Sequence, residues 1–248
     1  MRSLRKLVWL EIKIFAREPL GLIGTVLVPV AVFVMFGRLF GADLAAGAAG
    51  GVAFVSVAFP VFIATLIALN AVLSLVTIIA IYREGGILKR LRSTPLGPAA
   101  ILGAHVIVKL IFTAATLVLM VLAGRRYYPV DVDAPLAAFL AALLFVTASI
   151  VSIGFVIASL VPTARFAQPV AAVVMYPMIA LSGLFVPIEA LPMVLRVPAR
   201  ALPLTYAVSL LEGVWTRQPW TSYVTDVAAL AIFFVVCTAV ATRVFRWE

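Results

Sequence analysis

The sequence predicts an all-α polytopic membrane protein, a single domain with six transmembrane helices and both termini in the cytoplasm. Three observations predict this class: the apolar content, the long stretches without charge, and the placement of Lys and Arg. Of the 248 residues, 65% are apolar and 12% are charged, and the mean hydropathy is +1.21. Soluble domains contain roughly 45–50% apolar residues, and a soluble protein of this size cannot hide so many more from water.

Six stretches are long enough and apolar enough to cross a bilayer as helices. A transmembrane helix needs about 20 predominantly apolar residues, and the longest uncharged stretch here, 44–82, has 39. The apolar–polar alternation of barrel strands is absent, which favours helices. The predicted spans are residues 20–40, 52–82, 99–124, 135–160, 167–186 and 223–243.

The distribution of basic residues predicts the orientation. With the N-terminus in the cytoplasm, the cytoplasmic segments hold 12 of the 19 Lys and Arg residues and 4 of the 10 acids, a net charge of +8. The opposite side holds 6 bases and 6 acids, and Lys109 lies within the third span. Cytoplasmic loops carry excess Lys and Arg, so both termini are predicted to be cytoplasmic. Because these bases sit in short loops beside spans, no nucleic-acid partner is expected.

Residues 1–18 are predicted to form an amphipathic helix in the inner headgroup layer, and no cleaved signal peptide is expected. Glu11 and Glu18 project onto the apolar side of this helix. They either reach water at its edge, which is the favoured interpretation, or face a partner protein. The basic side, which faces anionic lipid, consists of Arg2, Lys6, Lys13 and Arg17.

The predicted cytoplasmic loop at residues 83–96 contains a second, shorter amphipathic helix. Gly85 and Gly86 loosen the exit from the second span, and prolines at 95 and 98 end the helix. Such a helix can rest on lipid or insert into a groove on a cytoplasmic protein. An apolar stripe lies beside three basic residues: Ile87, Leu88 and Leu91 beside Lys89, Arg90 and Arg92.

A proline-rich stretch, residues 183–222, lies between the fifth and sixth predicted spans and is too apolar for a solvated loop. Its prolines predict two short helices, near Ile188–Arg196 and Pro198–Ala201. We expect residues 183–203 to dip into the outer leaflet as a re-entrant cap, with Trp215 and Trp220 at headgroup level.

Several membrane activities need residues that the sequence lacks. One Cys and one His cannot build a metal site from these two residue types, and no Gly-x-x-x-x-Gly-Lys-Ser/Thr phosphate-binding motif is present. Every Asp and Glu lies at a span boundary or in a loop, which argues against proton coupling. A hydrolase nucleophile at Ser182 would lie near the face opposite His105. Energy for uphill transport would therefore come from another polypeptide.

Polar residues within the spans form weak stripes. Asn70 and Ser74 lie one helical turn apart in the second span, and His105 and Lys109 do so in the third. Helix packing is the favoured role for the first pair. For the second pair a structural role is favoured, because a lysine amine can reach the interface from that depth. A place on a translocation path is the alternative for both pairs.

Two sequence motifs stand out together. The first reads Glu84-x-Gly86-x-Leu88-Lys89-Arg90-Leu91-Arg92-x-Thr94-Pro95-Leu96. The second reads Leu181-Ser182-Gly183-Leu184-Phe185-x-Pro187, followed by Leu191-Pro192 and by Pro203-Leu204-Thr205-Tyr206-Ala207-Val208. The pair resembles ABC transporter permeases of the type-2 exporter family, which includes daunorubicin-resistance-like permeases, and the resemblance extends over essentially the whole chain. It departs from the family pattern at Leu202, commonly Asn, and at Ser209 and Glu212, often an acid and a base.

The resemblance implies one transmembrane permease domain, residues 1–248, without an ATPase site of its own. It would pair with a second permease copy or paralogue and with cytoplasmic ABC ATPase subunits, which bind ATP and Mg. Residues 83–96 would be the coupling helix, with the ATPase-coupling residues Arg83, Glu84, Gly86, Leu88, Lys89, Arg90, Leu91, Arg92 and Pro95. Residues 183–203 would form part of an outer gate that involves Ser182, Gly183, Phe185, Pro187 and Pro192.

The resemblance also implies an amphiphilic cargo, and the mostly apolar spans favour a drug or lipid exported across the plasma membrane, as in multidrug resistance. The alternative is a pore-forming or regulatory membrane protein that works without an ATPase. An intramembrane hydrolase acting through Ser182 is the least favoured interpretation.

Overall fold

The computed structural model describes residues 2–45, 59–86, 98–127, 135–161, 163–184 and 188–244, and the elements it describes there are helices. Two helices lead into the bundle, α1 (Arg2–Arg17) and α2 (Pro19–Leu22). A π-helical turn, η1 (Ile23–Leu27), joins α2 directly to α3 (Val28–Ala45). The other long helices are α5 (Phe59–Glu84), α7 (Pro98–Tyr127), α8 (Leu136–Leu160), α9 (Ala164–Leu181) and α12 (Val224–Val244). Between α9 and α12 lie η3 (Ile188–Ala190), α10 (Met193–Arg200), α11 (Pro203–Trp215) and η4 (Trp220–Ser222).

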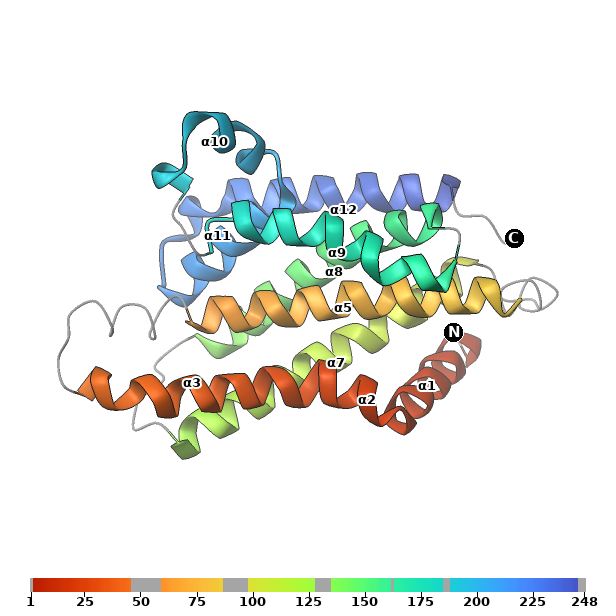
Figure 1. Ribbon diagram of the computed structural model, residues 1–248, viewed down its shortest axis with the longest axis horizontal. Helices are drawn as coiled ribbons and strands as arrows, with labels where there is room; N and C mark the ends of the chain where they lie inside the picture. Colours follow the sequence, from red (N-terminus) through yellow and green to blue (C-terminus); the bar gives the residue numbers. More distant parts are fainter. Residues whose placement is uncertain are drawn as a thin grey trace.

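The long helices run alongside one another, and α1 lies at one end of the bundle (Figure 1). The start of α1 and the end of α12 are at that same end, whereas α10 stands out from the bundle at the opposite end (Figure 1). The end that carries α1 is called the α1 end below.

Five helices are long and apolar enough to cross a membrane: Ala64–Glu84, Gly103–Ala123, Leu136–Leu160, Ala164–Leu181 and Val224–Val244. They overlap the second to sixth predicted spans, of which residues 52–58 at the start of the second lie outside the described residues. The first predicted span, 20–40, falls on α2, η1 and α3, where the apolar helical stretch Ile23–Met35 is shorter. The pair α10 and α11, bent by 81°, would make a sixth crossing if it were one broken span. The helical fold class is confirmed, while the number of crossings is five or six.

The centre of the bundle is formed by α5 and α8, which are the most completely buried of the long helices. Val72 and Leu75 of α5 and Ile150 of α8 are fully buried. Gly154 of α8 lies so close to α5 that an added Cβ would be 3.1 Å from Val72 Cγ1. Close packing of this kind makes α5 and α8 a rigid pair.

The outer helices expose apolar side chains that would be unfavourable in water. Val173 on α9 and Val235 on α12 are mostly exposed, as are many of their neighbours. Continuous apolar surface on helices of this length is typical of contact with lipid or with another membrane subunit.

The proline prediction for the stretch after α9 is wrong in detail. Pro198 lies inside α10 and does not separate two helices. The break falls at Ala201 and Leu202, and Pro203 is the first residue of α11. Proline suits that position because the first amide of a helix has no intrahelical acceptor. The absence of an amide hydrogen on proline therefore costs no hydrogen bond there.

Candidate functional site

The last three residues of α5 each contact a different element at the α1 end of the bundle. Tyr82 contacts α1, Arg83 contacts the end of α8, and Glu84 contacts the start of α9. Consecutive residues of a helix point in directions about 100° apart, so three in a row can reach three neighbours. The chain enters the predicted coupling segment directly afterwards, which makes this junction the candidate functional site.

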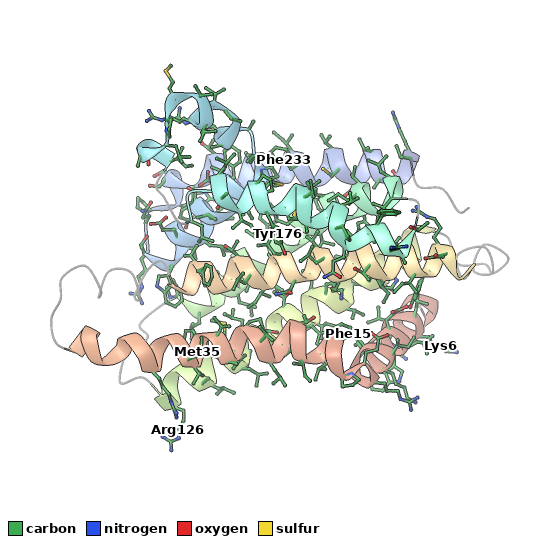
Figure 2. The ribbon with its side chains drawn as sticks, viewed as in Figure 1. Lys6, Phe15, Met35, Arg126, Tyr176 and Phe233 are labelled. Atoms are coloured by element: carbon green, nitrogen blue, oxygen red, sulfur yellow. The ribbon has the colours of Figure 1, made fainter. Side chains whose placement is uncertain are left out.

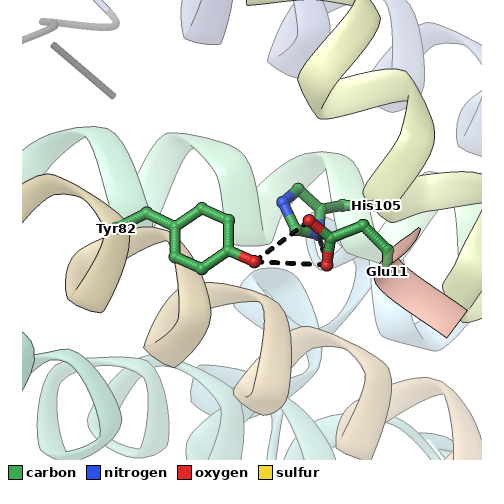
Figure 3. Close-up of polar contacts among 3 residues, drawn as sticks. All are labelled: Glu11, Tyr82 and His105. Carbon is green, nitrogen blue, oxygen red and sulfur yellow. Dashed lines mark hydrogen bonds and ion pairs between the residues drawn. The ribbon is translucent and has the colours of Figure 1, made fainter. Parts of the chain in front are cut away.

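A buried polar cluster joins α1, α5 and α7 (Figure 3). The Tyr82 hydroxyl donates to the Glu11 carboxylate, at 3.0 Å from Oε1 and 3.3 Å from Oε2. His105 Nδ1 lies 3.7 Å from Glu11 Oε2, within ion-pair distance. Glu11 is 6% exposed and His105 is 3% exposed. Burial raises the pKa of the Glu11 carboxyl above its ordinary value, although the hydrogen bond from Tyr82 and the nearby Lys109 charge oppose the rise.

Both interpretations of Glu11 from the sequence are wrong. Its side chain neither reaches water at the edge of the helix nor faces a partner protein, because it is buried against Tyr82 of its own chain. Glu18, in contrast, is exposed. The apolar face of α1 therefore packs on the bundle. Phe15 lies on that face, with its ring 4.4 Å from the ring of Phe112, and Lys6 points away from the bundle (Figure 2).

The predicted path residues divide between two places. Lys109 is 4% exposed, and its Nζ lies 4.6 Å from the centroid of the Phe15 ring, so Lys109 and His105 belong to the cluster beneath α1. Asn70 and Ser74 donate to carbonyl oxygens of their own helix, those of Leu66 and Ala71. Ser74 is eight residues before Tyr82, about 12 Å along α5. The structure does not bring the two pairs together.

Arg83 holds the C-terminal end of α8. Its Nη1 donates to the Val161 carbonyl and its Nη2 to the Ala158 carbonyl, both at 2.6 Å. The last carbonyls of a helix lack intrahelical donors. In a continuing helix the amide of residue 162 would donate to the Ala158 carbonyl, but residue 162 is a proline, which has no amide hydrogen. The Arg83 guanidinium supplies the missing donor.

Glu84 holds the N-terminal end of α9. Its Oε2 accepts a hydrogen bond from the Ala164 amide at 3.0 Å. The preceding residue, Thr163, makes no side-chain capping bond to this helix. Glu84 therefore takes the part of a capping residue from a different helix, and its negative charge suits the positive end of the α9 dipole.

Gly86 turns the chain away from α5. Its φ is +65°, and its amide donates to the Arg83 carbonyl at 3.0 Å. This left-handed conformation at a helix end is readily adopted by glycine and is strained for other residues. Six predicted coupling residues follow it, and they lie outside the described residues: Leu88, Lys89, Arg90, Leu91, Arg92 and Pro95.

The predicted outer-gate residues lie at the far end of α9. The Ser182 hydroxyl donates to the Ile179 carbonyl at 2.7 Å, and Gly183 follows with φ +88°. Ser182 is separated from Ala164 by the length of α9, about 27 Å, so it is remote from His105. Pro192 precedes α10 and is exposed. Phe185 and Pro187 lie outside the described residues.

Hydrogen bonds that sequence reasoning missed hold the bend between α10 and α11. Thr205 Oγ1 donates to the Ala199 carbonyl, and the Tyr206 hydroxyl donates to the Arg200 carbonyl, both at 2.6 Å. Arg196 turns back to the carbonyl of Glu189 in η3 at 2.6 Å. The Pro-Leu-Thr-Tyr motif indicated the hydrogen bonds of Thr205 and Tyr206, because these two hydroxyl-bearing residues stand just after the proline that begins a helix.

Within the part of the chain that the structure describes, no group of three or more His, Cys, Asp or Glu side chains is placed to hold a metal ion. The contacts brought together at the α1 end are hydrogen bonds, a close Glu11–His105 approach and helix caps, and they join α1, α5, α7, α8 and α9.

Comparison with known proteins gives a match over most of the chain. The family model described as "ABC-2 type transporter" matches residues 2–215. The protein named "Nodulation protein J" from Rhizobium leguminosarum bv. trifolii is 30% identical over 95 residues, which are 38% of this chain and 36% of that protein. The protein of the same name from Rhizobium leguminosarum bv. viciae is 30% identical over 95 residues, 38% of this chain and 37% of its own length. The matched part thus spans little more than a third of these relatives.

Proposed function

The chain belongs to the ABC-2 type transporter family, and on that basis we propose that it is the membrane-spanning permease subunit of an ATP-driven exporter. Its apolar helices supply the membrane part. The sequence has no phosphate-binding motif of the Gly-x-x-x-x-Gly-Lys-Ser/Thr type. ATP and Mg are therefore bound by a separate ABC ATPase subunit, and this chain contributes no catalytic residue.

The observation that carries this proposal is the family match combined with the position of residues 83–96. This segment begins with Arg83 and Glu84, the last two residues of α5, the helix that packs at the centre of the bundle with α8. A segment that transmits force needs a rigid base, and α5 provides one. The apolar stripe of Leu88 and Leu91 between basic residues suits a groove on the ATPase.

The proposed orientation places the α1 end in the cytoplasm. The face of α1 away from the bundle exposes Arg5, Lys6, Lys13 and Arg17 together with Trp9. Basic residues with an aromatic ring suit an anionic headgroup layer. Both chain ends then lie on the cytoplasmic side of the plasma membrane, and the 183–203 region forms part of an outer gate.

The proposed assembly contains two permeases, identical or paralogous, and two ATPase subunits. The exposed apolar faces of α9 and α12 leave room for both lipid and a second permease. The cargo is amphiphilic, a drug or a lipid, because the spans are mostly apolar.

Copurification tests the proposal. The chain is expressed with candidate ABC ATPase subunits, and Leu88→Asp/Leu91→Asp should abolish recovery of the ATPase because charge cannot enter an apolar groove. Leu160→Asp is the matched control, since Leu160 is 68% exposed at the same end of the bundle. If the double variant recovers as much ATPase as the wild type does, residues 83–96 do not dock onto the ATPase. A wild-type chain that mediates flux unaffected by ATP, and recovers no ATPase, supports the pore-forming alternative.

A further inference from the structure

We infer that Arg83 and Glu84 are positioning residues that carry movement of the coupling segment to the junction of α8 and α9, and do not dock onto the ATPase themselves. The inference rests on the proposed function and deepens it. It concerns the contacts of the Arg83 and Glu84 side chains, which the resemblance alone assigns to ATPase coupling.

The first step is that both side chains make contacts to other helices of the chain, Arg83 half-buried and Glu84 at the exposed surface. Arg83 makes two hydrogen bonds to α8, across 75 and 78 residues of sequence, and Glu84 makes one to α9, across 80 residues. Charged hydrogen bonds are among the stronger polar contacts. Both Nη atoms of the half-buried Arg83 guanidinium are engaged at 2.6 Å, so reaching a second protein would require breaking these contacts.

The second step is that the charges match the polarity of the two helix ends. The positive Arg83 lies at the carbonyl end of α8, and the negative Glu84 lies at the amide end of α9. Helix ends carry partial charges of the opposite signs. Because the partners are backbone groups, their polarity is fixed, and exchanging the two side chains cannot restore the contacts.

The third step is the route from this junction to the far end of the bundle. Glu84 lies two residues before Gly86, where the coupling segment begins, and it caps the first amide of α9. From there α9 extends for 18 residues, about 27 Å, with Pro169 and Pro177 in its interior. At its other end are Ser182 and Gly183, which lead into the 183–203 region. The clasp, meaning Arg83 and Glu84 with their three backbone partners, therefore links the two regions assigned to coupling and gating.

The experiment follows α9 while ATP binds. The full chain, in a Cys237→Ser background, carries an environment-sensitive fluorophore at Val173→Cys, an exposed position midway along α9. It is purified with its ATPase subunit in lipid nanodiscs. Emission is recorded before and after ATP with vanadate, and ATPase recovery and nucleotide trapping are measured on the same samples.

In the wild type, ATP with vanadate should change the emission. In Arg83→Ala and Glu84→Ala the ATPase should still copurify and trap nucleotide, but most of the emission change should be lost, because the charged hydrogen bonds to α8 or α9 are removed. Glu84→Gln, whose carbonyl still accepts from the Ala164 amide, should retain most of the change, and Arg83→Lys should be intermediate. The exchange Arg83→Glu/Glu84→Arg should not restore it.

Arg165→Ala is the matched control, because it removes an exposed cation one residue from Ala164 and should leave the change intact. Loss of ATPase recovery in Arg83→Lys and Glu84→Gln would mean that these side chains dock directly, and would overturn the inference. An emission change in Arg83→Ala equal to that of the wild type, with ATPase bound, would overturn it as well. Failure of the wild type to recover any ATPase would instead overturn the proposed function, and this inference with it.

Discussion

Tyr82 at the end of α5 donates a hydrogen bond of 3.0 Å to Glu11 of α1, a residue 71 positions earlier in the chain. The contact fastens the amphipathic helix to the helix from which the coupling segment leaves. It also explains how a carboxylate is tolerated on the apolar face of α1, since buried charges need hydrogen-bonding partners.

Removal of the Tyr82 hydroxyl should weaken the attachment of α1. Tyr82→Phe leaves the buried Glu11 carboxylate without its donor, and we expect a loss of about 2 kcal/mol in unfolding free energy. Unfolding of the detergent-solubilised chain by denaturant measures it. Tyr176→Phe is the control, because Tyr176 is largely exposed on α9 (Figure 2). Equal stability of the two variants would contradict the prediction.

The Glu11 carboxyl should make stability depend on pH. Its pKa is raised in the folded chain, mainly by burial, so the folded state binds its proton more readily than the unfolded state. The contribution of this group is therefore present below the ordinary value of 4.5 and is lost as pH rises toward the raised pKa. Melting temperatures of the wild type should fall over that window relative to Glu11→Gln, which cannot titrate. Parallel pH profiles of the two proteins would refute this assignment.

Gly86→Ala should misdirect the coupling segment without a steric clash. Among the residues that the structure describes, no atom lies within 4 Å of the added Cβ, but a φ of +65° carries a strain of roughly 1–2 kcal/mol for alanine. We expect reduced ATPase recovery, measured by copurification. Gly103→Ala is the control, since Gly103 also has open space around it but lies within helix α7 without a positive φ. Its recovery should equal that of the wild type.

The bend between α10 and α11 should depend on Thr205. Thr205→Val keeps the shape of the buried side chain but removes the donor to the Ala199 carbonyl, a loss of about 1–3 kcal/mol. Thermal unfolding should show it, and spin labels on α10 and α11 should show a broader range of distances. Thr216→Val is the control, because that exposed hydroxyl bonds only within its own turn. An unaltered distance distribution in Thr205→Val would show that the bend is held by other contacts.

The sequence predicts the helices well because apolar length is a local property. Five predicted spans coincide with α5, α7, α8, α9 and α12, and the exit at Gly86 was expected from the glycine pair. The division of the 183–222 stretch at Pro198 failed, because Pro198 lies inside α10, whereas Pro203 takes the first position of α11, where a missing amide hydrogen costs no helical bond.

The partners of charged residues could not be predicted in the same way. Helical projection placed Glu11 on the inner face of its helix, but it gave no information on what lies opposite, since Tyr82 and His105 are distant in sequence. Arg83 and Glu84 were assigned to a loop that faces another protein. A signal for their actual partners was present in the proline at 162, which leaves a carbonyl of α8 without a donor.

That proline has a consequence for how such chains diverge. Replacing it with a residue that carries an amide hydrogen would create a competitor for the Ala158 oxygen and relax the need for Arg83. The two positions should therefore vary together among descendants of this sequence. We expect Arg83 to be replaced mainly in those descendants in which the proline at 162 has already been replaced.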